Sequence, residues 1–371
     1  AVAGVTTAAA FIPSSGQLGN KNLIINGAMT IAQRNTTLTA EGFACDRFEY
    51  LRSGKDEELT ISQHVLTSSD TGPWEEGFRH SVHLQNGNQS NGAGSNDYTI
   101  IRYKVEAQDL ASCGWNYNSA TSYLTLSYWI RSSVSQSFPA YVRSHDGTAR
   151  IYSWDTGTLS ADTWTKITKT IPGDGNITIN NDNGIGMLIT FPGYWGGTWT
   201  DNGVTYEDWR AWGSGNERVK DYTTTWWTTD DATLELTGVQ LEVGSHATPF
   251  EHRSFGDELR RCQRYYEKSY PYGTAPGTSG DTGRRGRRVC ASATNQTVIT
   301  NEQYQVRKRA TPTVTTYSNN GDSGKVMLMD YGSTTVHANS SVYGSCDYGF
   351  EVSGSGTANA IAVFWEADAE L

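Results

Sequence analysis

The sequence predicts an all-β protein with an N-terminal β-sandwich of the jelly-roll type, a short connector helix and a smaller C-terminal β-sandwich. About ten short segments with strand-like patterning, separated by turn-rich stretches, precede residue 254, and helical spacing begins only there. Hydrophobic residues make up only 36%, while Gly reaches 39, Trp 12 and Tyr 20 of 371 residues, a composition that suits strands, turns and aromatic surfaces.

Residues 1–21 are small, turn-rich and without a period, so we expect an extended arm. The strands of the first domain, 22–253, follow from alternation or short apolar runs bounded by turn residues. The predicted strands are 58–66, 79–85, 98–106, 123–131, 140–143, 149–154, 163–171, 184–191 and 233–243.

The last of these strands contains a change of parity. Its apolar residues occupy one parity up to Leu236 and the other from Val239 onward, with Gly238 between them. A β-bulge at Gly238 would supply one extra residue and restore a single apolar face. The side chains expected on that face are Leu234, Leu236, Val239, Leu241 and Val243.

A helix is predicted after Pro249. Ser254 can cap it with Asp257 three residues on, and Phe255, Leu259, Cys262 and Tyr266 follow at helical spacing. This gives a connector of about three turns over 254–268. The stretch 269–288 is predicted as a loop, and the C-terminal β domain, 269–371, has predicted strands at 289–299, 302–306, 313–317, 325–329, 349–352 and 358–366.

Composition and charge exclude several classes of protein. The net charge of −10 argues against nucleic-acid binding, which needs a basic face. No apolar run is long enough to span a bilayer, so membrane insertion is not expected. The five cysteines are scattered without C-x-x-C spacing, which predicts free thiols rather than disulfides or a zinc site. No cofactor or metal is expected.

An aromatic cluster over 191–227 is the strongest candidate for a site, because six of the twelve tryptophans fall there without regular spacing. Flat rings beside polar side chains suit sugar recognition, in which rings stack on the C–H faces of pyranoses. The alternatives are a loop that wraps its own aromatic core and a contact between subunits. The candidate glycan-binding residues are Tyr194, Trp195, Trp199, Tyr206, Trp209, Trp212, Trp226 and Trp227.

A second candidate is an arginine run that could bind anionic groups such as phosphates. More often such a run is a solvated loop or pairs with acidic residues of the same assembly. The run comprises Arg284, Arg285, Arg287 and Arg288. No catalytic residues are predicted, because the acid pairs are sequence neighbours that point to opposite faces of a strand, and known catalytic motifs are missing. Calcium in the loop 174–183 is conceivable, but turn chemistry explains the same residues.

Two ends of the first domain carry a resemblance. N-L-I-I-N-G-A-M-T-I-A-Q-R at 22–34, G-V-Q-L-E-V-G at 238–244, A-T-P-F-E-H-R at 247–253 and E-L-R-R-C-Q-R-Y-Y-E-K at 258–268 are similar to the recurring module of bacteriophage tail-fibre and receptor-binding proteins. V-R-K-R-A-T-P-T-V at 306–314 and F-W-E-A-D-A-E-L at 364–371 resemble the domain that often follows this module.

The resemblance implies a carbohydrate-binding jelly roll in a homotrimeric protein. Such a protein lies in the virion tail and is exposed to the medium, and its N-terminal arm would bind other tail or capsid proteins. The function we expect is non-catalytic recognition of a bacterial surface glycan during host attachment. The alternatives are a purely structural virion fibre or connector protein and a polysaccharide depolymerase.

Overall fold

The computed structural model describes residues 19–213, 218–283, 285–329 and 335–371. Strands dominate, and the predicted all-β class with an N-terminal jelly-roll sandwich and a short helix is confirmed. The predicted N-terminal arm lies almost wholly outside the described residues.

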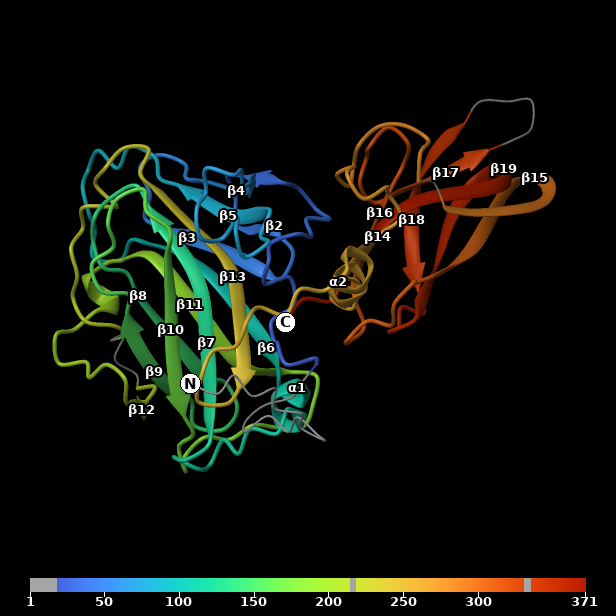
Figure 1. Cartoon of the computed structure of the whole chain (residues 1–371). Helices are drawn as coiled ribbons and strands as arrows, with labels where there is room; N and C mark the ends of the chain where they lie inside the picture. Colours follow the sequence, from blue (N-terminus) through green and yellow to red (C-terminus); the bar gives the residue numbers. More distant parts are fainter. Residues whose placement is uncertain (1–18, 214–217, 284, 330–334) are drawn as a thin grey trace, which may run out of the picture.

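Two antiparallel sheets form the sandwich on the left of Figure 1. The six-stranded sheet has the order β1 (Thr37–Leu38), β4 (Thr60–Val65), β5 (His80–Gln85), β13 (Thr233–Val243), β7 (Tyr123–Ser132) and β10 (Thr165–Pro172). The seven-stranded sheet has the order β12 (Trp209–Ala211), β9 (Arg150–Asp155), β8 (Pro139–Ser144), β11 (Ile185–Trp195), β6 (Tyr98–Glu106), β3 (Phe48–Ser53) and β2 (Gly42–Cys45).

The inner faces of the two sheets meet in one apolar core. Alternate residues of each strand point inward, as the pleat requires. The largest fully buried aromatic side chains of the core include Trp154, Tyr128 and Phe48. The sandwich is therefore held together mainly by apolar surface removed from water.

The predicted bulge in β13 is confirmed. The register of β13 against β7 shifts between Thr237 and Gln240, and Gly238 takes a φ of 64°. Leu234, Leu236, Val239 and Leu241 are all buried in the core, with Val243 packed against it. One extra residue thus returns the whole apolar set to one face.

Several elements differ from the sequence prediction. Strands β1, β2, β3 and β12 were not predicted, nor was helix α1 (Ala107–Ser112). In β3 the outward Leu51 obscures the alternation of Phe48 and Tyr50. Helix α1 is only six residues long and buries only Ala107 and Leu110, which is too short a segment to show a helical period.

The connector helix α2 (Phe255–Gln263) begins where the sequence predicts. Ser254 Oγ accepts a hydrogen bond from Asp257 N at 3.2 Å, which caps the helix. The helix ends earlier than predicted, because Tyr266 enters strand β14 (Tyr266–Lys268) and pairs with Asp368.

The remaining strands form a third sheet, on the right of Figure 1. Its members are β14, β15 (Arg285–Gln303), β16 (Thr313–Tyr317), β17 (Lys325–Met329), β18 (Val336–Tyr343) and β19 (Gly349–Asp368). Strand β19 pairs with all the others along its length. The sequence prediction divided β15 and β19 and missed β18. The gap between the two predicted strands contains Gly354 and Gly356. A Cβ at Gly354 would lie 2.4 Å from Val326 and one at Gly356 would lie 2.8 Å from Leu328, so the glycines permit close packing.

A buried polar clasp joins the segment that enters the sandwich to the segment that leaves it. Asn22 receives a hydrogen bond from Leu241 N at 3.1 Å and donates its backbone N–H to Glu251 at 3.0 Å. Arg253 donates to the carbonyls of Asn22 and Ile24. These hydrogen bonds run between the two segments, so the two ends close as a unit.

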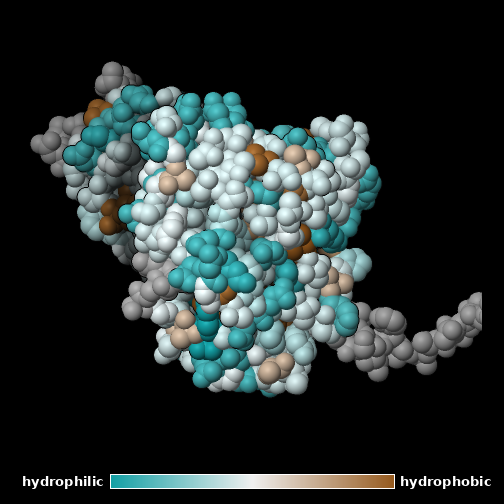
Figure 2. Space-filling model, turned by 90° about the vertical axis from the view of Figure 1, so that its left-hand side faces the viewer, coloured by the Kyte–Doolittle hydropathy of each residue, from teal (hydrophilic) through white to brown (hydrophobic). Residues whose placement is uncertain are grey.

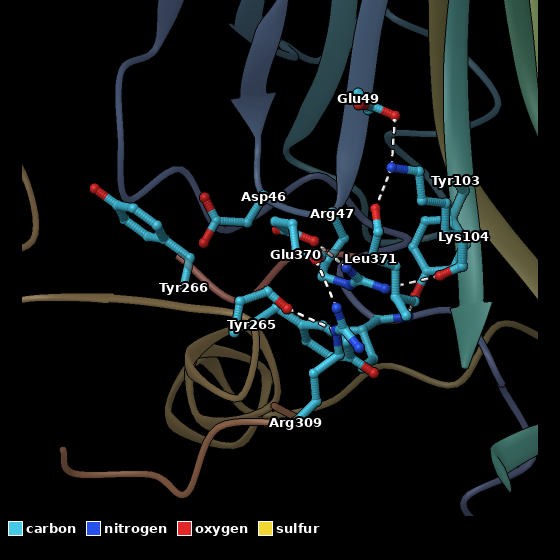
Figure 3. Close-up of polar contacts among 12 residues, drawn as sticks. Asp46, Arg47, Glu49, Tyr103, Lys104, Tyr265, Tyr266, Arg309, Glu370 and Leu371 are labelled. Atoms are coloured by element: carbon cyan, nitrogen blue, oxygen red, sulfur yellow. Dashed lines mark hydrogen bonds and ion pairs between the residues drawn. The ribbon is translucent and has the colours of Figure 1, made fainter. Parts of the chain in front are cut away.

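A second polar junction joins the third sheet to the sandwich (Figure 3). The buried Arg47 pairs with Glu370 and stacks on Tyr265 at 3.5 Å. Arg309 donates to the backbone carbonyl of Glu370 at 2.8 Å, and Lys104 binds the carbonyl of Leu371. Burial acts to lower the pKa of Arg47, but the Glu370 carboxylate outweighs it and the pKa is raised.

The surface offers few apolar features. Strongly hydrophobic residues form only isolated spots on the side shown in Figure 2. None of the helices in the described residues combines the length and the apolar composition that crossing a membrane requires.

Replacing Gly238 by alanine should destabilise the sandwich. A side chain in the left-handed region costs ~1–2 kcal/mol, and the new Cβ would lie 2.7 Å from the Phe78 ring. We expect a loss of about 2 kcal/mol or more in the free energy of unfolding, measured in urea. Gly256→Ala in α2, with no atom within 4 Å of its Cβ, is the matched control and should be neutral or stabilising. Equal shifts in both variants would contradict the role assigned to the bulge.

Candidate functional site

The outer face of the seven-stranded sheet carries aromatic and basic side chains on neighbouring strands. On β6, Ile101 points into the core, so Tyr98 and Arg102 point away from it. By the same alternation, Tyr141 and Arg143 of β8 point outward. These side chains therefore meet above the sheet.

The chain after β11 folds back over this face. Trp195 is buried there with Val219 and with Ile151 of β9, and Trp199 and Trp212 pack against them while remaining partly exposed. The loop and the sheet together enclose a groove of about 150 Å3.

Arginine side chains occupy the ring faces in this groove. The guanidinium of Arg218 lies 4.0 Å from the ring centre of Trp199 and 4.4 Å from that of Trp195. The guanidinium of Arg143 lies 4.5 Å from the ring of Trp212. Cation–π attraction of this kind holds the loop against the sheet. It also covers ring faces that a sugar would otherwise contact.

Five buried polar atoms of the groove-lining residues have no hydrogen-bond partner among the described residues. Four are nitrogen atoms of N–H groups, which donate hydrogen bonds, and the fifth is a hydroxyl oxygen, which can also donate one. They are Nε1 of Trp195, Nε1 of Trp199, Nε of Arg143, Nη1 of Arg218 and Oγ1 of Thr190. Buried polar groups in folded proteins are almost always satisfied, so this concentration indicates a place for acceptor atoms from outside the chain.

The groove is also basic. Arg102 pairs with Glu49 at 2.7 Å, whereas no carboxylate among the described residues pairs with Arg143 or Arg218. Burial lowers the pKa of both Arg143 and Arg218, because the charged form loses water without gaining a counter-ion. A negatively charged ligand would supply that counter-ion.

The structure divides the predicted aromatic cluster into two groups. Trp195, Trp199 and Trp212 lie together in the groove, and Tyr206 packs against the same cluster. The prediction that the other four are displayed on the surface is wrong, because they are buried in the sandwich core. These are Tyr194, Trp209, Trp226 and Trp227.

Local geometry explains the burial. A register shift in β11 between Pro192 and Tyr194 turns Tyr194 inward, where it stacks on Trp227 at 4.8 Å. The amide of Asn86 donates to the backbone carbonyls of Trp226 and Trp227 and holds their turn against the core. Neither effect is visible in the spacing of the tryptophans.

The arginine run does not form the predicted loop. Arg284 lies outside the described residues, and the backbone of Arg285, Arg287 and Arg288 belongs to strand β15. In the loop considered for calcium, the Asp174 carboxylate accepts two hydrogen bonds from Asn176 at 2.8 and 2.9 Å, which is turn chemistry.

Of the groove-lining residues, the sequence reasoning found only three tryptophans. Among those that it missed are Tyr98, Tyr141, Arg143 and Arg218. The outward-facing positions of the predicted strands 98–106 and 140–143 could have revealed Tyr98, Tyr141 and Arg143. These positions carry Tyr and Arg, where solvent-facing positions of a strand usually carry smaller polar residues.

Comparison with known proteins finds no matching family model and no matching curated protein. Partial similarity is found to many solved structures, three of which follow. The enzymatically active domain of tailspike protein 4 of bacteriophage CBA120 is 10% identical, with a TM-score of 0.32, over 60% of this chain and 21% of that one. This chain thus spans about a fifth of the length of that domain.

The N-terminal cellulose-binding domain of Cellulomonas fimi β-1,4-glucanase C is 12% identical over 58% of this chain and 99% of that one, with a TM-score of 0.27. The family 11 carbohydrate-binding module of Clostridium thermocellum, in complex with a mixed-linked tetrasaccharide, is 10% identical over 56% and 91%, with a TM-score of 0.24. At these values the similarities do not tell what this chain binds.

Two tryptophan variants should separate the core group from the groove group. Trp227→Ala empties a fully buried site and should cost ~3–5 kcal/mol of stability. Trp212→Ala removes a partly exposed ring and should cost about 1 kcal/mol. Thermal or urea unfolding measures both values. A large loss in Trp212→Ala would make the groove a second core rather than a site.

Proposed function

We propose that this chain is a receptor-binding subunit of a bacteriophage tail fibre that recognises a bacterial surface glycan without cleaving it. The observation that carries the proposal is the set of five unpartnered buried polar atoms in one aromatic groove. Sugar hydroxyls and ring oxygens supply the acceptors that these groups lack. The tail-fibre resemblance of the motifs at both ends of the sandwich supports the biological setting.

The ligand we propose is an acidic glycan, one that bears carboxylate or phosphate groups. The guanidinium groups of Arg143 and Arg218 already cover the faces of Trp199, Trp195 and Trp212. Recognition then depends on N–H groups of the indoles and guanidiniums more than on ring stacking. Charge-assisted hydrogen bonds to an anion are about twice as strong as neutral ones.

A purely structural fibre protein is the second candidate. The burial of Trp226, Trp227 and Trp209 favours it, because much of the tryptophan-rich segment stabilises its own domain. Under that alternative, groove variants change assembly or stability and leave glycan binding unchanged.

Neutralising the groove should weaken glycan binding. Arg143→Gln and Arg218→Gln each remove charge-assisted hydrogen bonds worth ~1.5–3 kcal/mol, so affinity should fall roughly 10- to 100-fold. The measurement is binding to an array of bacterial capsular and lipopolysaccharide glycans, followed by titration of the strongest acidic one. The same glycan with its carboxyl groups reduced to alcohols should bind as weakly as the variants do.

The matched control is Arg79→Gln, which breaks an equivalent stack on Trp74 at 3.7 Å on another part of the sandwich. Its binding should equal that of the unaltered protein. Equal binding by all three variants would refute the groove as the site, and release of reducing ends from the glycan would refute the non-catalytic role.

We further propose that three copies of the chain assemble in the virion tail, with residues 1–21 docked on other tail or capsid proteins. Light scattering should give the mass of three 40.7 kDa chains. Trimeric display multiplies a weak single-site affinity by ~10²–10⁴ on a multivalent surface. A monomeric or dimeric mass would contradict this assembly.

A further inference from the structure

A cluster of potential metal ligands lies on the opposite outer face of the sandwich, on the six-stranded sheet. His64 comes from β4, His83 from β5 and Glu235 from β13, three strands that are neighbours in the sheet. The register places His83 directly opposite Glu235, and His64 opposite Ser81, one diagonal step away. The three side chains therefore project from one face toward a common point.

The ligand atoms already lie near coordinating distances. Nδ1 of His64 is 2.9 Å from Nδ1 of His83 and 3.9 Å from Oε2 of Glu235. All the potential ligand atoms fall within 4.8 Å of one another. Tetrahedral Zn²⁺ with bonds of ~2.0–2.1 Å separates its ligand atoms by roughly 3.3 Å. Side-chain rotations that bring the farthest pair of these atoms closer by roughly 1.5 Å would meet that geometry.

The nitrogen atoms are available to a metal. The only hydrogen bond that the described residues make to either Nδ1 is the one between the two rings, which stack with centres 5.1 Å apart. A neutral imidazole carries one bare nitrogen, and neutral imidazole is the form that binds metals. A metal ion would take the place of the proton that the two Nδ1 atoms share, and both nitrogens would bind it.

The surrounding charges favour a cation. Arg131 donates to Glu235 Oε1 at 2.7 Å and to Asp70 at 2.8 Å, so two carboxylates face one guanidinium. Glu235 Oε2 remains on the side of the imidazoles, where Ser81 Oγ donates to it at 2.8 Å. Arg131 and Ser81 thus orient the carboxylate as outer-shell partners do in metal sites.

We propose that His64, His83 and Glu235 bind one Zn²⁺ ion per chain and so link strands β4, β5 and β13. Two imidazole nitrogens and one carboxylate oxygen form a ligand set that zinc accepts. The side chain of His64 is 42% exposed and that of Glu235 only 4%, so the fourth position faces solvent and takes a water molecule. The proposal is independent of the glycan groove, which lies on the other sheet.

The test uses the full chain without a polyhistidine tag, freed of metal with a chelator and titrated with ZnCl2 in a calorimeter. The unaltered protein should bind one Zn²⁺ per chain, and its thermal unfolding temperature should rise with zinc concentration. His64→Ala and His83→Ala should each weaken binding at least tenfold and abolish the rise.

His246→Ala is the matched control, because His246 is exposed and contacts Ser245 away from the cluster. This variant should bind zinc as the unaltered protein does. Unfolding temperatures without zinc show whether each variant is folded. If His83→Ala does not fold, the zinc binding of His64→Ala, at the more exposed position, decides the test. Absence of binding by the unaltered protein, or full binding by His64→Ala, overturns the proposal.

Discussion

The polar clasp between residues 22–27 and 239–258 closes the sandwich. Asn22 satisfies the backbone of Leu241, Val239 accepts from the Asn22 amide, and Arg253 and Glu251 satisfy the backbone around Asn22. These groups are largely withdrawn from water, so each needs its partner at a fixed position. The motifs that carry the tail-fibre resemblance at both ends of the domain are thus the parts that hold it shut. Recognition has to be sought on the outer faces of the sheets.

Each outer face of the sandwich carries its own set of side chains, because the apolar residues of the strands pack in the core. The seven-stranded sheet presents arginines stacked on indoles, with unsatisfied N–H groups between them. The six-stranded sheet presents a row that runs from His64 through Glu235 to Arg131. The outer face of the seven-stranded sheet is rich in hydrogen-bond donors. That of the six-stranded sheet carries imidazole nitrogens and a carboxylate, which can donate electron pairs to a metal ion. Because side chains alternate along each strand, one set packs in the core and the other stays on the outer face, and the two sheets present different outer sets on opposite sides of the domain.

The sequence predicts those features that depend on neighbouring residues. Strands β6, β7 and β13, the bulge at Gly238 and the cap at Ser254 all follow from local patterns. Features that depend on distant contacts escape it. Strand β19 continues through Gly354 because Val326 packs there, and the tryptophans separate into core and groove only through the register shift in β11. Of the eight candidate aromatic residues, Trp195, Trp199 and Trp212 line the groove and Tyr206 packs beside it. Strand parity points to Arg143 but not to Arg218, which lies outside the strands.

The junction at Glu370 has a mechanical consequence. The buried Arg47 and the partly exposed Arg34 hold this carboxylate from the sandwich, while Arg309, in the connection between β15 and β16, holds its backbone. A pulling force on the long strands β15 and β19 is then transmitted through Glu370 to Arg47, in the turn between β2 and β3. A load on the third sheet therefore reaches the sandwich through these ion pairs as well as through the covalent chain.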